Sequence, residues 1–99
     1  MKIGYRIYWT NNALAELAAT ITYLKENFSD KELRKLAFKI ESTIQLISIN
    51  PNVFPKSEIK DIYRVVIFKY NTMYYRIQRD NIEILSFFSN RQDPTRKKI

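Results

Sequence analysis

Hydrophobic residues recur with a helical period early in the chain. Between residues 11 and 28 one stripe contains residues three or four positions apart, namely Leu14, Leu17, Ala18, Ile21, Leu24 and Phe28. Glu16, Thr20 and Glu26 lie away from this stripe. The pattern predicts an amphipathic helix over residues 11–28, and the hydroxyl of Thr10 is placed to cap its first turn.

A second amphipathic helix is predicted over residues 30–49. Its hydrophobic face contains Leu33, Leu36, Ala37, Ile40, Ile44 and Ile47. Ser29 and Glu32 have the spacing of a capping box, in which the Ser29 side chain accepts a hydrogen bond from the backbone N–H of Glu32. Asn50-Pro51 ends the helix, because a residue before proline disfavours the helical conformation. Since only a short break separates the two helices, we expect an antiparallel helical hairpin.

The other periodic segments are typical of strands. Residues 3–9 alternate in polarity, and residues 62–68, 73–79 and 82–88 are rich in β-branched and aromatic side chains. Residues 51–61 are predicted to form a loop, and residues 90–99 a basic C-terminal tail. The order β-α-α-β-β-β predicts one α+β domain over residues 1–99, with the helical hairpin packed on one face of a mainly antiparallel, twisted sheet.

The predicted turns set the register of the last three strands. If Asp80-Asn81 is a two-residue turn, Arg76 faces Leu85. The core side of the sheet then contains Met73, Tyr75, Ile77, Ile82, Ile84 and Phe88. If Lys69–Asn71 is a three-residue loop, Arg64 lies directly opposite Arg76 on the outer side of the sheet, where two like charges repel each other.

Two interpretations of these two arginines remain open. Each side chain could point into solvent or pair with Glu83. Alternatively, Arg64 and Arg76 form a site for phosphate groups or acidic side chains, with Tyr74 and Phe87 beside them for stacking. Four other tyrosines are better explained as core residues than as residues with a chemical role, and we assign Tyr8, Tyr23, Tyr63 and Tyr75 to the core.

Composition narrows the possible chemistry. The 99 residues include no His and no Cys, which excludes Ser–His and Cys–His hydrolase mechanisms, thiolate metal sites and disulfides. Because His is the commonest metal ligand and Cys the thiolate one, we expect no metal, and because the single Gly excludes a glycine-rich phosphate-binding loop, we expect no cofactor. No hydrophobic run approaches the roughly 20 residues that span a bilayer, and no secretory signal is visible, so we expect a cytoplasmic protein without a membrane partner.

The charge is strongly asymmetric along the chain. The formal net charge is +7, and residues 51–99 hold ten basic and five acidic side chains. The tail contributes Arg91, Arg96, Lys97 and Lys98 against Asp93. This distribution favours nucleic acid or an acidic protein as the partner.

Three segments in this order resemble the RelE/ParE superfamily of type II toxin–antitoxin toxins, which includes plasmid stabilisation proteins. Residues 8–24 (YWTNNALAELAATITYL) are similar to the end of the family's first strand and its first helix. Residues 46–55 (LISINPNVFP) resemble the exit from its second helix. Residues 63–94 (YRVVIFKYNTMYYRIQRDNIEILSFFSNRQDP) resemble its last three strands and the arginine that follows them.

The resemblance implies a growth-inhibiting toxin of the ParE-like branch, which inhibits DNA gyrase or a similar macromolecular target. Arg64 and the run Tyr74-Tyr75-Arg76 match the ParE-like pattern, and Arg91 matches both branches. Thr72 stands where RelE-like members have an important Arg, and Ser89 is nearest to a His of some relatives. The implied target-binding or anion-binding residues are Arg64, Arg76, Arg91, Arg96, Lys97 and Lys98.

Two alternatives follow from the same resemblance. One is a RelE-like ribosome-dependent endoribonuclease that cuts mRNA without a metal, using Arg64, Arg76, Arg91 and Tyr74. In that case no residue of the chain is an obvious general base. The other is an inactive relative that only binds its antitoxin. The implied partner in every case is a small acidic antitoxin, with a homodimer or a heterotetramer with the antitoxin as possible assemblies.

Overall fold

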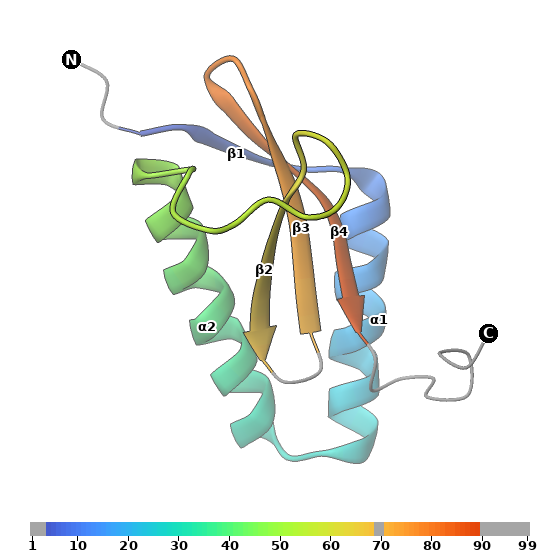
Figure 1. Cartoon of the computed structure of the whole chain (residues 1–99). Helices are drawn as coiled ribbons and strands as arrows, with labels where there is room; N and C mark the ends of the chain where they lie inside the picture. The colour runs from blue at the N-terminus through green and yellow to red at the C-terminus, as the bar shows by residue number, and fades with distance from the viewer. Residues whose placement is uncertain (1–3, 69–70, 90–99) are drawn as a thin grey trace.

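Helices and strands follow one another in the predicted order in the computed structural model, which describes residues 4–68 and 71–89 (Figure 1). The elements are β1 (Arg6–Trp9), α1 (Asn11–Asn27), α2 (Asp30–Ile49), β2 (Tyr63–Phe68), β3 (Asn71–Gln78) and β4 (Asn81–Ser89). The predicted α+β order β-α-α-β-β-β is therefore confirmed. The predicted tail, with Arg91, Arg96, Lys97 and Lys98, lies outside the described residues.

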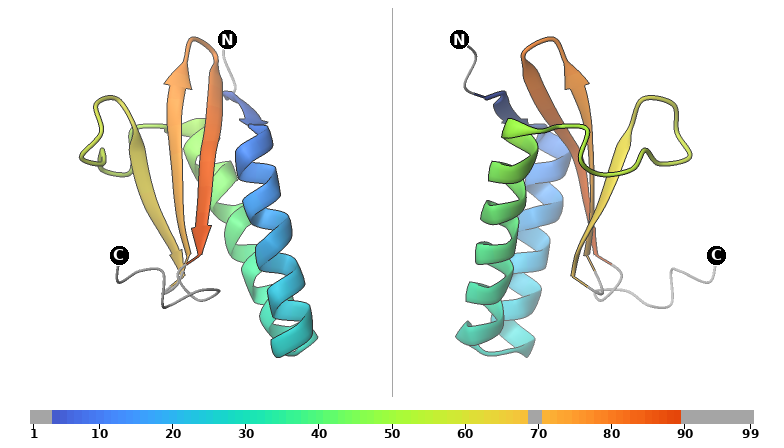
Figure 2. Two further views of the ribbon diagram at one scale, coloured as in Figure 1. Left: turned by 90° about the vertical axis from the view of Figure 1, so that its right-hand side faces the viewer. Right: turned by 60° about the vertical axis from the view of Figure 1, so that its left-hand side comes forward.

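The sheet has four strands in the order β1-β4-β3-β2. β1 runs parallel to β4, and the other neighbouring strands are antiparallel, so the predicted mainly antiparallel sheet is confirmed. α1 and α2 lie side by side in opposite directions on one face of the sheet, as predicted, whereas the segment 51–62 bulges toward the opposite face (Figure 2). No helix within the described residues is long and apolar enough to cross a membrane.

The core lies between the two helices and the sheet. Its largest fully buried side chains are Tyr75, Phe87, Ile47, Met73, Ile82 and Ile84. Tyr63 and Tyr75 belong to this core and Tyr23 packs against it, as predicted. The prediction for Tyr8 is wrong, because this residue of the edge strand β1 is 61% exposed.

α1 is rotated relative to the predicted hydrophobic stripe. Its fully buried residues are Ala13, Thr20 and Leu24, whereas Leu14, Ala18 and Phe28 are exposed. Two residues that lie away from the predicted stripe are covered: Glu16 is partly buried and Thr20 is buried. Thr20 is tolerated in the core because its hydroxyl donates a 3.0 Å hydrogen bond to the Glu16 carbonyl of its own helix.

Polar side chains of α1 determine this rotation by binding the edge of β4. β1 pairs with β4 only as far as Ile84, which leaves the later backbone groups of that edge without a strand partner. Thr10 Oγ1 donates to the Ile84 carbonyl at 2.9 Å, and Asn12 Nδ2 donates to the Leu85 carbonyl at 3.0 Å. Glu16 Oε1 accepts hydrogen bonds at 2.8 Å from both the Phe87 N–H and Ser86 Oγ.

The ends of both helices were largely predicted. Thr10 caps α1 as expected, since its side chain accepts a hydrogen bond from the Ala13 N–H at 3.2 Å. Ser29 is the N-cap residue of α2, but its side chain makes no capping hydrogen bond, so the predicted capping box is wrong. The Glu32 N–H instead donates to the backbone carbonyl of Ser29 at 3.1 Å. α2 ends at Ile49, directly before Asn50-Pro51.

The β3–β4 turn differs from the prediction by one residue. Gln78 is opposite Asn81, so the turn residues are Arg79 and Asp80, and Arg79 has a left-handed φ of 57°. A bulge then follows, since Tyr75 is opposite Ile84 whereas Tyr74 is opposite Ser86.

The turn changes which residues of β3 and β4 face each other, and the bulge changes which side chains of β4 face the core. Arg76 faces Glu83 and not Leu85. Phe87 is buried, whereas Phe88 is 45% exposed, which reverses the prediction that Phe88 lies in the core. The bulge has this effect because it moves the residues after it to the other face of the sheet.

The packing predicts a contrast between two isoleucines of α2. Ile47 is 0% exposed and Ile49 is 72% exposed. Ile47→Ala should lower the free energy of unfolding by about 2–5 kcal/mol, because it removes buried methylene groups and leaves a cavity. Ile49→Ala is the matched control and should change it by less than about 0.5 kcal/mol. Urea unfolding followed by circular dichroism measures both, and equal effects would contradict the packing.

The contact between α1 and β4 predicts a larger effect for Glu16 than for another glutamate of the same helix. Glu16→Ala should lower the free energy of unfolding by about 1–3 kcal/mol, because the Phe87 N–H loses its acceptor. Hydrogen exchange of that amide should become faster. The exposed Glu26 is the control, and Glu26→Ala should leave both the unfolding and the exchange nearly unchanged.

Candidate functional site

The face of the sheet opposite the helices contains three rows of side chains that cross the strands. One row contains Val66, Thr72 and Phe88, the next contains Arg64 and Tyr74, and the third contains Arg76 and Glu83. We refer to these seven residues as the outer face. The face therefore places an apolar row beside two rows that contain arginine.

Arg64 and Arg76 are not opposite each other. The register between β2 and β3 pairs Arg64 with Tyr74, so Arg76 is its diagonal neighbour, at a distance typical of about 7–8 Å between Cα atoms. The predicted opposed pair is wrong because Phe68 pairs with Asn71 after a register shift, which changes the alignment that a three-residue loop would give. The direct repulsion expected between the two arginines is thereby reduced.

The two arginines have different ionic environments. Arg76 Nε lies 2.6 Å from Glu83 Oε1, which confirms for this residue the interpretation that it pairs with Glu83. Arg64 is exposed, and no carboxylate among the described residues lies within ion-pair distance of it. Arg64 is therefore the outer-face arginine without a carboxylate partner among the described residues.

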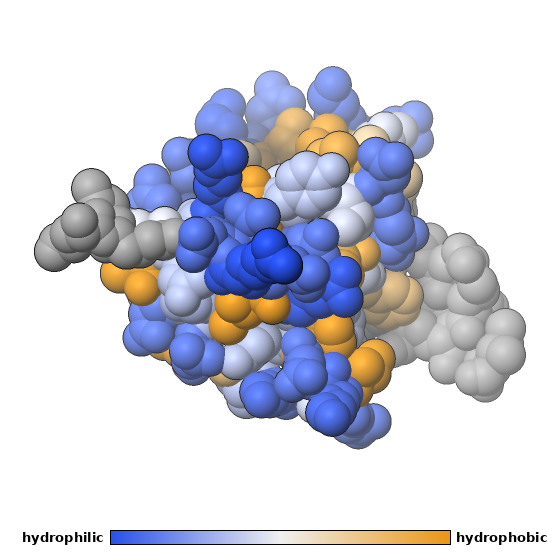
Figure 3. All heavy atoms as spheres, turned by 90° about the horizontal axis from the view of Figure 1, so that it is seen from above, coloured by the Kyte–Doolittle hydropathy of each residue, from blue (hydrophilic) through white to orange (hydrophobic). Residues whose placement is uncertain are grey.

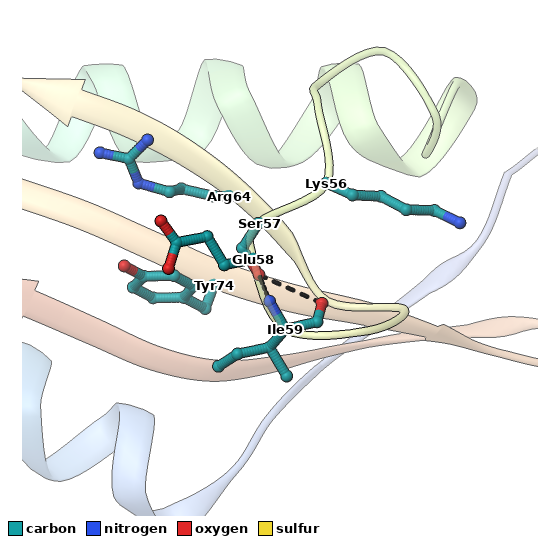
Figure 4. A pocket seen from close by; sticks show the side chains of 6 residues that line it. All are labelled: Lys56, Ser57, Glu58, Ile59, Arg64 and Tyr74. Carbon is teal, nitrogen blue, oxygen red and sulfur yellow. Dashed lines mark hydrogen bonds between the residues drawn. The ribbon is translucent and has the colours of Figure 1, made fainter.

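A hollow of about 440 Å³ lies between Arg64 and the loop that precedes β2. It is lined by Lys56, Ser57, Glu58, Ile59, Arg64 and Tyr74 (Figure 4). The Glu58 side chain points across the hollow toward Arg64 and Tyr74, whereas Lys56 points away from them (Figure 4). The hollow thus brings together a guanidinium, a carboxylate and a phenol.

The loop that forms one wall of the hollow is anchored along the edge of β2. The Pro55 carbonyl accepts a hydrogen bond from the Arg64 N–H at 3.1 Å, and the Ser57 N–H donates to the Ile62 carbonyl at 2.6 Å. The Ser57 hydroxyl accepts from the Ile59 N–H at 3.1 Å, which fixes the turn that contains Glu58.

Lys56 belongs to the base of this loop. Its Nζ lies 3.7 Å from Asp61 Oδ1 and 5.8 Å from the centre of the Tyr63 ring. Lys56 also lines a second hollow of about 270 Å³, together with Arg76 and Gln78. The contacts with Asp61 and Tyr63 hold the Lys56 ammonium group away from the Arg64 hollow.

Two stacked tyrosines support the site from the core side. The rings of Tyr63 and Tyr75 are 5.1 Å apart and nearly parallel, with an angle of 8° between them. The Tyr75 hydroxyl donates to the Pro51 carbonyl at 2.8 Å, and the Tyr63 hydroxyl bonds to Asn52 Oδ1. Burial raises the pKa of Tyr75 well above its ordinary value, and the neighbouring Tyr63 raises it further. Tyr75 therefore stays protonated and acts as a structural hydrogen-bond donor.

The structure brings together part of the predicted site. Arg64, Tyr74 and Arg76 share the outer face, but Phe87 is buried in the core and cannot stack there, so that prediction is wrong. Among the described residues, no cluster of three or more His, Cys, Asp or Glu side chains is arranged to hold a metal ion.

Sequence reasoning missed the residues that the loop contributes, chiefly Glu58 and Ile59. The segment has no hydrophobic period, and the only signals in it are its prolines and its density of charge. An end-on view of this part of the molecule, with the loop and the β3–β4 turn, shows mostly hydrophilic side chains with small separate hydrophobic groups (Figure 3).

Solved structures with the same fold are toxins of toxin–antitoxin systems. A chromosomal ParDE system from P. aeruginosa matches with a TM-score of 0.72 and 16% identity, over 89% of this chain and 98% of that one. The YoeB dimer from Staphylococcus aureus matches with a TM-score of 0.60 and 18% identity, over 85% and 94%. The E. coli DinJ-YafQ toxin–antitoxin complex matches with a TM-score of 0.59 and 9% identity, over 90% of this chain and 96% of that one.

The family is shown by sequence. A comparison with curated proteins found no match. The family model described as "ParE toxin of type II toxin-antitoxin system, parDE" matches residues 7–94, which include every helix and strand except the first residue of β1. The chain therefore belongs to the ParE toxin family of type II toxin–antitoxin systems.

Proposed function

We propose that this toxin inhibits DNA gyrase, or a similar macromolecular target, by binding it through the outer face. The observation that carries the proposal is the position of Thr72, which lies in register between Val66 and Phe88. RelE-like nucleases resemble this chain but have an arginine at that position. A neutral side chain in an apolar row does not grip a scissile phosphate, whereas it suits contact with a protein surface.

Arg64 is the principal contact in this proposal. It is exposed and has no carboxylate partner in the described part of the chain, and a guanidinium binds a carboxylate or phosphate with two parallel hydrogen bonds. Arg76 contributes less, because Glu83 already occupies its Nε. Arg91, Arg96, Lys97 and Lys98 follow β4 in the sequence, and we propose that they add attraction for an acidic target.

A second candidate function, metal-independent cleavage of mRNA at the ribosome, is favoured by one specific observation. Glu58 supplies a carboxylate in the same hollow as Arg64 and Tyr74. A carboxylate of this kind can remove a proton from a 2′-hydroxyl, and Arg64 can stabilise the charge that develops on the phosphate. The chain has no histidine that could perform the first of these roles.

We further infer that a small acidic antitoxin neutralises this toxin in the cytoplasm. Structures that resemble the chain are described as a ParDE system and as YoeB-YefM and DinJ-YafQ complexes, one of them heterotetrameric. The net charge of +7 supports an acidic partner. A heterotetramer with the antitoxin or a homodimer is the expected assembly.

The gyrase proposal predicts that Arg64 matters more than Arg76. Arg64→Ala should raise the concentration that half-inhibits DNA supercoiling by purified gyrase about tenfold or more, since it removes a charged hydrogen-bonding group. Arg76→Ala should have a smaller effect, and Thr72→Ala, the control, should have little. Induction of the DNA-damage response on expression should follow the same order. Normal supercoiling at saturating wild-type protein would contradict the proposal.

Glu58 separates the two candidate functions. Glu58→Gln should abolish cleavage if this carboxylate is the general base of a nuclease. Primer extension on cellular messages measures this, and discrete 5′ ends within translated codons that disappear in Glu58→Gln would favour the nuclease. Growth that continues unchanged on expression of the wild-type chain would favour the inactive relative that binds only its antitoxin.

The antitoxin inference predicts a stable complex with the product of the neighbouring small reading frame. Co-expression should give a complex that co-purifies at low salt and weakens as salt screens the charges. Growth should be restored at the same time. Separate elution of the two proteins at low salt would remove the support for this partner.

A further inference from the structure

We propose that the hollow beside Arg64 binds an acidic side chain of a protein partner, and that Glu58 competes with this side chain for Arg64. The inference rests on the proposed function, because it assigns a contact to the same outer face. It goes further by giving the chemical class of the ligand and by assigning a restraining role to the loop between α2 and β2.

The first support is the state of Arg64. It is exposed and makes no ion pair with any described residue, although its backbone is fixed by the hydrogen bond to the Pro55 carbonyl. Two neighbouring cations are already engaged: Lys56, which lines the same hollow, pairs with Asp61, and Arg76, the diagonal neighbour, pairs with Glu83. An incoming anion therefore meets, at Arg64, a cation whose charge no described carboxylate already neutralises at ion-pair distance.

The second support is the position of Glu58. Its side chain points toward Arg64 and Tyr74 from the opposite wall of the hollow, and the hydrogen bond between the Ser57 hydroxyl and the Ile59 N–H holds the turn around it (Figure 4). The hollow therefore already contains one carboxylate. Glu58 repels a second carboxylate that approaches Arg64. Glu58 also offsets part of the positive charge of Arg64, which weakens the attraction between Arg64 and that second carboxylate.

The third support concerns the kind of partner. The loop and the outer face hold four cations, Lys56, Lys60, Arg64 and Arg76, against three carboxylates, Glu58, Asp61 and Glu83. Binding to nucleic acid depends on many phosphate contacts, and such a balanced surface offers few. Ile59, Val66 and Phe88 are exposed large hydrophobic residues on the loop and the face. An arginine without a carboxylate partner among the described residues, with apolar side chains as neighbours, suits a protein segment that carries an acidic side chain between hydrophobic ones.

The experiment is a nuclear magnetic resonance titration of the purified, ¹⁵N-labelled chain. The probe is the peptide acetyl-Leu-Glu-Leu-amide, and the same peptide with Gln in place of Glu is its control. Signals of the Arg64 side-chain Nε–H and the Tyr74 backbone N–H report on the hollow. We expect the Glu peptide, and not the Gln peptide, to shift both signals of the wild-type chain.

Three variants test the competition. Glu58→Gln should tighten binding of the Glu peptide about twofold to fivefold, as expected for the removal of one partly exposed ionic interaction. Asp61→Asn is the matched control, because it removes a carboxylate of the same loop that pairs with Lys56, and it should leave binding at Arg64 unchanged. Arg64→Gln should abolish the shift of the Tyr74 signal. Thermal unfolding midpoints of the variants establish that each is folded.

Several results would overturn the inference. Equal or weaker peptide binding by Glu58→Gln would show that Glu58 does not compete, and retained binding by Arg64→Gln would place the ligand elsewhere. A twelve-nucleotide single-stranded RNA that shifts the same signals at lower concentration than the peptide would indicate nucleic acid instead. The titration contains no gyrase, so it tests the two proposals separately. If the wild-type chain inhibits gyrase but does not bind the Glu peptide, only this inference is overturned. If it binds the peptide as expected but does not inhibit gyrase, only the proposed target is overturned.

Discussion

The carboxylate of Glu16 joins the helical layer to the sheet at the point where strand pairing ends. β4 has a strand neighbour on this edge only as far as Ile84, and a buried backbone N–H without an acceptor is costly. Glu16 accepts the Phe87 N–H, and Thr10 and Asn12 bind the carbonyls before it. These bonds fix the rotation of α1, which in turn decides that Thr20 is buried and Leu14 is exposed. The helix is therefore positioned by the polar requirements of a strand edge as well as by hydrophobic burial.

This explains which parts of the fold the sequence could predict. Helix bounds depend on local signals, and Thr10 and Asn50-Pro51 lie within a few residues of the ends that they determine. The rotation of α1 depends on β4, which is about seventy residues away in the chain, so the stripe of Leu14 and Phe28 was assigned to the wrong face. The pairing of β1 with β4 likewise depends on contacts between distant parts of the sequence, so no local pattern predicts it.

The candidate site shows the same division at the scale of single residues. Alternation along β2 and β3 was enough to put Arg64, Tyr74 and Arg76 on one face. Their mutual distances depend on the register between β2 and β3, which shifts by one residue between Val66 and Phe68. Phe87 and Phe88 exchange faces because a bulge in β4, where Tyr75 is opposite Ile84 and Tyr74 is opposite Ser86, adds one residue to that strand. Glu58 was missed because a loop without a period acquires its place only by hydrogen bonding to the edge of β2.

The distribution of charge indicates that different residues attract a partner over a distance and recognise it at contact. The outer face and its loop hold four basic and three acidic side chains, and α2 holds the same numbers. Residues 90–99 of the sequence, by contrast, hold four basic side chains and one acidic side chain. The formal charge of +7 therefore does not come chiefly from the site. A field of this kind speeds the approach of acidic partners and is weakened by salt, but it does not choose between them. The choice falls to the few groups that keep free donors or apolar surface at contact, and among the described outer-face arginines only Arg64 has no carboxylate partner.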